Sequence, residues 1–425
     1  MLAKLAQLIT VSDLRKRVIA VTLLLVVFRL LAQVPIPKVD ALRMQELMAQ
    51  NQALGAASIL MGGTLDTISI VMLGVGPYIT ATIILQLLTM IFPHLKTIYY
   101  EDGAVGRAKF NRLARQITVP LAALQSYSLL RYLAAQNVIS NIAPLDFVTN
   151  TIVVTAGSMI LLWIGELIEE QKLGSGISLI IFAGIVSSLP ATLYLGYEQF
   201  TTGTLRPDTL LAFAVLAVLV VTGVVLVNEA ERKIPVSYAK QMHGSRAQGG
   251  IASYLPLRVN QAGVIPIIFA VSLLMFPQIA AQIVLLISPA VGASIQLFAT
   301  QITTNQLIYG TLYFTLVFVF TYFYTSVVFN PSEIAKNLQR SGGFIPGMRP
   351  GAPTAEYLGG IVSRITLFGA LFLASIAVLP TITQSVTNAR NLTIGGTALL
   401  IVVSVALETA KQIDSQLKIR EYELT

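Results

Sequence analysis

Long apolar runs, separated by short polar segments, constrain the fold of this chain more than any other feature. Each run is close to the roughly 20 residues that a helix needs to cross a bilayer, and backbone groups in lipid must pair within their own segment. The chain of 425 residues is 55% hydrophobic and 11% charged, whereas a soluble domain carries about 25% charged residues. We therefore predict an all-α polytopic membrane protein with ten transmembrane helices. The predicted spans are 18–34, 70–92, 115–134, 151–169, 176–190, 208–228, 261–279, 306–329, 360–380 and 392–410.

The distribution of basic residues predicts the orientation. Of the 28 Lys and Arg residues, 22 lie on the side that holds both termini, 5 lie on the other side, and Arg29 lies within the first span. Basic residues collect on the cytoplasmic side, so we expect both termini in the cytoplasm. Ten spans then divide into two halves of five, residues 1–190 and 208–411, with an external hinge loop at 191–207 and a tail at 412–425. If the halves share a fold, an odd number of spans per half makes them inverted relative to each other.

The residues that most enzymes depend on are scarce. The chain has no cysteine and two histidines, and it lacks the H-E-x-x-H, G-x-S-x-G and G-x-x-x-x-G-K-[ST] patterns. We therefore expect no catalytic site, metal or cofactor. An intramembrane hydrolase is disfavoured for the same reason, because no nucleophile set is present.

The stretch 55–77 is broken by glycines and ends in Gly76-Pro77. Residues 56–69 are too short to span a bilayer and too apolar for an ordinary loop. Broken helices at membrane depth occur inside protein or beside a water-filled cavity. One interpretation is a re-entrant segment that closes a pathway, and the alternative is an amphipathic segment on the membrane surface.

After this break, Val75, Ile79 and Ile83 recur at intervals of four and therefore share one helix face. A face of branched apolar side chains can form a hydrophobic constriction, which excludes water and ions. The alternative is ordinary packing between helices.

Few charged residues lie inside the spans, among them Arg29, Glu166 and Glu408. Glu166 and Glu408 lie near the cytoplasmic ends, where we expect structural roles. A transporter driven by ions usually needs paired buried carboxylates. An ion-coupled secondary transporter with broken helices is the alternative function, and the missing carboxylate pair counts against it.

Two long basic loops, 229–260 and 330–358, face the predicted cytoplasmic side. Long basic loops suit docking of a large acidic or polyanionic partner. The alternative is that their charge only retains the loops in the cytoplasm, which accounts for the sign but not for the length.

Several ordered motifs resemble the SecY family of protein-translocation channels. They are PIPKVD (35–40), GPYITATIILQLLT (76–89), GSGISLIIFAGIVSSLP (174–190), LPLRVNQAGVIPIIF (255–269) and FIPGMRPG (344–351). The resemblance implies an hourglass pore between two inverted halves, a plug, and a gate that opens sideways into lipid.

The resemblance also implies roles for residues at matching positions. The pore ring falls on Val75, Ile79, Ile181, Ile268 and Ile401, with Ile83 and Ile265 as neighbours. The plug falls on 55–69, including Gly62, Gly63 and Leu65, and the polar lateral gate on Thr80, Gln125 and Asn260. Docking positions for the ribosome and the motor are Arg232, Lys233, Lys240, Arg246 and Arg349.

The function implied is the pore-forming subunit of a bacterial protein translocase in the plasma membrane. It would conduct unfolded or nascent polypeptides that carry signal sequences and release transmembrane segments into the lipid bilayer. The implied partners are the small subunits SecE and SecG, the ATPase SecA, and the ribosome.

Overall fold

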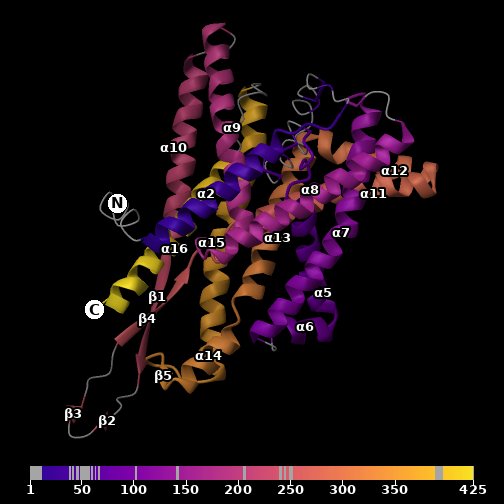
Figure 1. The fold of residues 1–425 in the computed structure, drawn as a ribbon. Coiled ribbons are helices and arrows are strands. Elements are labelled where there is room, and N and C mark those ends of the chain that lie inside the picture. The colour runs from indigo at the N-terminus through magenta and orange to yellow at the C-terminus, as the bar shows by residue number, and fades with distance from the viewer. Residues whose placement is uncertain are drawn as a thin grey trace.

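The structure is a computed structural model, shown in Figure 1. It describes residues 12–37, 40, 43–44, 47, 58, 61–62, 64–65, 68–100, 103–139, 143–203, 207–238, 242–243, 246–247, 252–387 and 396–424.

Each of the ten predicted spans overlaps one long helix, so the predicted helical membrane fold is confirmed. These helices are α2 (Ser12–Ala32), α5 (Gly76–Ile91), α7 (Gly103–Ala135), α8 (Pro144–Glu170), α9 (Gly176–Thr201), α10 (Pro207–Glu229), α11 (Ile265–Ile287), α13 (Gln306–Val328), α15 (Ala352–Thr387) and α16 (Gly396–Leu424). Three further helices connect them: α6 (Pro93–Tyr100), α12 (Pro289–Thr304) and α14 (Pro331–Arg340).

Apolar length differs among these helices. In the described part of the chain, five helices are long and apolar enough to cross a membrane. They are α8, α9, most of α10, α13 together with α14, and most of α15. The pair α5 and α6, bent by 113°, adds a sixth if it counts as one span, and α11 contains a shorter apolar helix, Ile265–Gln278.

The helix α9 is longer than the sequence predicted. It continues through Pro190 to Thr201, so the first part of the predicted loop 191–207 is helical. A proline removes one backbone donor and kinks a helix, which makes it a poor guide to where a helix ends when both flanking segments are apolar.

The two long basic loops fold together into a small sheet that the sequence did not predict. Strands β1 (Glu231–Tyr238) and β4 (Ala252–Arg258) form an antiparallel hairpin, and β5 (Gly343–Phe344) from the second loop pairs with β1. Near the hairpin tip, β2 (Met242–His243) pairs with β3 (Arg246–Ala247). Ile234 and Val236 alternate along β1 with exposed residues and pack against Leu257, Ile345 and Leu358. The two loops therefore form one structural unit.

Several of the segments predicted to be cytoplasmic lie towards one end of the molecule. In Figure 1 the strands, α6 and α14 lie towards the lower end, whereas the end of α9 and the start of α10 lie at the opposite end. The two long basic loops and the α6 segment therefore lie on the same side of the fold.

Candidate functional site

The seven residues of the predicted pore ring and its neighbours lie in one apolar cluster. Val75 precedes α5, Ile79 and Ile83 lie in α5, Ile181 in α9, Ile265 and Ile268 in α11, and Ile401 in α16. All are buried except Ile265, which is partly buried and packs against the same cluster. Four helices far apart in sequence thus contribute branched apolar side chains to a common interior. Such side chains offer no hydrogen-bonding groups, so a collar made of them can close around any extended chain without specific bonds.

The second helix of each predicted half, α5 and α11, begins with the same local pattern, Gly-Val-x-Pro. Gly74 (φ +55°) precedes Val75, the N-cap of α5, and Gly263 (φ +62°) precedes Val264, the N-cap of α11. In both helices a proline follows within the first turn, where its missing N–H costs nothing. This repeat is hard to recognise in the sequence, because only a short pattern recurs.

The predicted plug, 55–69, is described only in part. Gly63 lies outside the described residues, whereas Gly62, Thr64 and Leu65 lie within them. Thr64 and Leu65 are fully buried, and Leu65 packs with Met72, Leu130 and Leu133. These described residues are inside the protein rather than on a membrane surface, which favours the re-entrant interpretation.

The end of the plug segment is fixed by backbone hydrogen bonds to the residues that follow α2. The Ile36 N–H donates to the Ile68 carbonyl at 3.0 Å, and the Ile70 N–H donates to the Val34 carbonyl at 3.0 Å. These bonds flank an isolated antiparallel bridge between Pro35 and Ser69. The predicted plug segment therefore leads into α5 from a backbone that is hydrogen-bonded to the residues after α2.

The predicted lateral-gate residues fall into two hydrogen-bonded groups. Gln125 Nε2 on α7 donates to Thr80 Oγ1 on α5 at 3.3 Å. Asn260 Nδ2 instead donates to Asn228 Oδ1 on α10 at 2.8 Å, and Asn228 Nδ2 donates to Ser404 Oγ on α16 at 2.7 Å. The structure brings Thr80 and Gln125 together and ties Asn260 to the C-terminal half.

Sequence analysis did not single out Asn228 and Ser404. The only signal they offer is a polar residue within an apolar run, which many membrane helices contain. Asn260 lies two residues after β4, and the Val259 N–H donates to the Ala230 carbonyl at 2.9 Å. Asn228 therefore links the base of the β1–β4 hairpin to α16.

Replacing Asn228 with leucine is expected to destabilise the protein by about 1–2 kcal/mol, because Asn260 and Ser404 both lose a partner. The matched control is Lys411→Ala, which removes the Lys411–Glu229 ion pair (2.8 Å) between the same two helices. That pair is partly exposed, so its loss costs about 0–1 kcal/mol. Thermal unfolding in detergent gives the midpoint temperature of each variant. A midpoint temperature for Lys411→Ala as low as that for Asn228→Leu would contradict this ranking.

The predicted docking residues lie on the small sheet and beside it. Arg232 and Lys233 are exposed on β1, and Arg349 is exposed after β5. Arg246 lies on β3, but its side chain, like all of Lys240, is outside what the structure describes. Both long loops thus present exposed basic side chains on or beside one small sheet.

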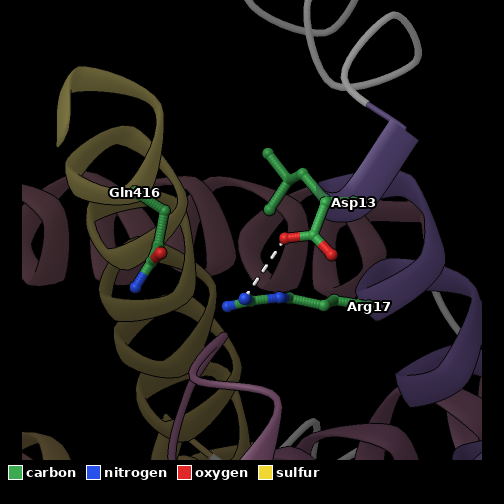
Figure 2. Close-up of a pocket in the computed structure, with 4 residues that line it drawn as sticks. Asp13, Arg17 and Gln416 are labelled. Carbon is green, nitrogen blue, oxygen red and sulfur yellow. Dashed lines mark hydrogen bonds and ion pairs between the residues drawn. The ribbon is translucent and has the colours of Figure 1, made fainter. Parts of the chain in front are cut away.

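Glu166 and Glu229 pair with basic residues of neighbouring helices. Glu166 Oε1 lies 2.9 Å from Arg115 Nε on α7, and Glu229 bonds Lys411 as described above. Among the described residues, no three His, Asp or Glu side chains gather as metal ligands. A small hollow between α2 and α16 is lined by Asp13, Leu14, Arg17 and Gln416, and the Asp13–Arg17 ion pair (3.2 Å) closes one side of it (Figure 2).

Comparison with known proteins gives the family. The SecY family profile matches residues 69–410. The protein translocase subunit SecY of Streptomyces coelicolor is 41% identical, with 100% of this chain and 99% of that protein covered. Its counterpart in Mycobacterium leprae is 40% identical, with 97% and 96% covered.

Solved structures give the same fold at low sequence identity. A protein-conducting channel has a TM-score of 0.64 at 16% identity, with 93% of this chain and 90% of that one covered. The Sec61 channel of a canine ribosome–channel complex has the same TM-score, identity and coverage. With the sequence identities to curated relatives, these matches show that the chain belongs to the SecY family.

Proposed function

We propose that this chain is the pore-forming subunit of a protein translocase. It would conduct unfolded polypeptides across the membrane and release transmembrane segments sideways into lipid. The observation that carries the proposal is the buried apolar cluster to which four helices contribute the predicted ring residues. The relatives are translocase subunits and the structural neighbours are channels, so the ion-coupled transporter has no support among them.

The inverted-repeat arrangement is part of this proposal. The Gly-Val-x-Pro pattern at the start of α5 and α11 supports two halves, 1–190 and 208–411, of equivalent fold. A pore at the interface of such halves would be lined by both, which fits a cluster drawn from α5, α9, α11 and α16. Lateral opening at this interface would separate α5 and α7 from α11, so a signal sequence would have to displace the contacts that α11 makes with these two helices.

Orientation and partners follow from charge. The excess of basic residues on the side of the strands supports an orientation with both termini in the cytoplasm. The relatives from Streptomyces and Mycobacterium support a location in a bacterial plasma membrane. The exposed basic residues of β1 and Arg349 would then meet the ribosome or the ATPase SecA. SecE, SecG and substrate signal sequences complete the proposed set of partners, and energy would come from a partner because the chain itself is proposed to be no enzyme.

Site-specific photocrosslinking tests this function. A photoreactive residue at Ile79 or Ile268 is expected to crosslink to a precursor arrested during translocation, because both side chains are buried in the apolar cluster. The matched control is Trp163 on α8, whose side chain is 62% exposed and faces outward. Crosslinks at Trp163 but not at Ile79 or Ile268 would contradict a path through the cluster.

A further inference from the structure

Arg29 is a charged residue in the last turn of α2, within the first predicted span, and its position calls for a partner. A cation within a membrane span is costly and is normally paired with another residue or a backbone carbonyl. Arg29 Nη1 donates a hydrogen bond to the Gly62 carbonyl at 3.3 Å, and the guanidinium carbon lies 5.6 Å from the centre of the Phe28 ring. This hydrogen bond reaches into the predicted plug.

The backbone of Gly62 is packed closely between α2 and α9. Its φ of +74° lies in the left-handed region that favours glycine. A Cβ on Gly62 would lie 3.2 Å from Phe28 Cζ and 3.5 Å from the Ile180 carbonyl oxygen. From the other side, a Cβ on Gly184 would collide with the backbone of Gly62. Only a pair of glycines allows the plug backbone to approach α9 this closely.

The residue before Gly62 is held in a similar way. A Cβ on Gly74 would lie 2.5 Å from the Met61 carbonyl oxygen. The turn before α5 therefore also packs closely against this backbone. Met61 and Gly62 are thus enclosed by α2, by α9 and by the turn before α5. Gly184 lies one helical turn beyond Ile181, a predicted ring residue, so the enclosed backbone sits next to the proposed constriction.

We propose that Arg29 is a positioning residue that latches the plug to α2 and α9 and so favours the closed channel. This inference rests on the proposed function, because it takes residues 55–69 as the plug. When the plug leaves, Arg29 loses this part-buried, charge-assisted hydrogen bond. The latch therefore opposes plug release without touching the translocating chain.

The test uses the full-length chain in lipid vesicles and takes advantage of the absence of native cysteine. A single thiol introduced by Met61→Cys reports plug release as its rate of labelling by a membrane-impermeant reagent. In this background, Arg29→Met is expected to raise the labelling rate about tenfold, the effect of losing one charge-assisted hydrogen bond. Arg29→Lys should fall between Arg29→Met and the parent, because it keeps the charge but not the planar guanidinium.

Two glycine variants separate the latch from a general loss of stability. Gly184→Ala pushes on Gly62 with Arg29 intact, so it should also raise the labelling rate. Gly310→Ala in α13 is the matched control, because its Cβ would meet Val378 at an ordinary 3.4 Å and should leave labelling unchanged. If Arg29→Met fails to fold, Arg29→Lys and Gly184→Ala decide the outcome.

Parent-like labelling of the folded Arg29 and Gly184 variants would overturn the latch, as would equal acceleration by Gly310→Ala. Labelling does not require translocation, so this result is distinct from a failure of the proposed function. A chain that imports no precursor would refute the function, whereas normal import with unchanged labelling would refute only the latch.

Discussion

Deletion of residues 57–67 is expected to raise the resting ion conductance of the channel at least about tenfold, which corresponds to about 1.4 kcal/mol of lost closed-state stability. The deletion removes Leu65, which is fully buried against Met72, Leu130 and Leu133, and it removes the Gly62 carbonyl to which Arg29 donates. Without these contacts, only the apolar ring remains to exclude water and ions. Single-channel recording in planar bilayers measures the conductance.

The same variant should still translocate precursor, because the deletion leaves the ring residues and the docking strands in place. The control is Leu65→Ala, which shortens one buried side chain and keeps the backbone of the segment. Its conductance should lie between that of the deletion and that of the parent. Conductance of the deletion variant equal to that of the parent would show that these residues do not close the pathway.

Replacing Arg349 with glutamate is expected to lower motor-driven translocation at least about tenfold, as reversal of an interface charge typically does. The Arg349 side chain is exposed, and the fold uses its backbone, whose carbonyl accepts a hydrogen bond from Thr354 Oγ1 at 2.8 Å. The substitution should therefore leave folding and assembly intact. Precursor uptake into vesicles with SecA and ATP measures the effect.

Lys336→Glu provides the matched control for Arg349→Glu. Lys336 is exposed on α14 in the same loop, and its replacement makes the same change in charge. If both variants lose uptake equally, general electrostatics rather than a contact at Arg349 explains the loss. Normal uptake by Arg349→Glu would remove Arg349 from the motor site.

The membrane fold could be predicted from the sequence because a span is a local property. An apolar run of the right length forms a helix whatever surrounds it, and each predicted span does overlap a helix. The small sheet could not be predicted, because β5 pairs with β1 from a loop about a hundred residues earlier in the chain. The alternation of Ile234 and Val236 was its only local signal, and a single short alternation is weak.

Features of the candidate site that lie on one helix could be predicted from residue spacing, whereas contacts between distant helices could not. Val75, Ile79 and Ile83 share one helix face, which their spacing predicts, whereas Ile181, Ile268 and Ile401 come from three other helices and were found only through the family resemblance. Arg29 stood out as an intramembrane charge, but its contact with Gly62 depends on how α2, α9 and the plug segment pack. The Asn260–Asn228–Ser404 chain depends on tertiary packing in the same way.

The most direct measurement of the proposed function is import of a signal-bearing precursor into vesicles that contain this chain, SecE and SecA. If the chain is the translocase pore, added ATP should make full-length precursor resistant to external protease. That protection should disappear when the vesicle membrane is dissolved with detergent. Protection no greater than in vesicles that lack this chain, under conditions where a SecY relative supports import, would contradict the account.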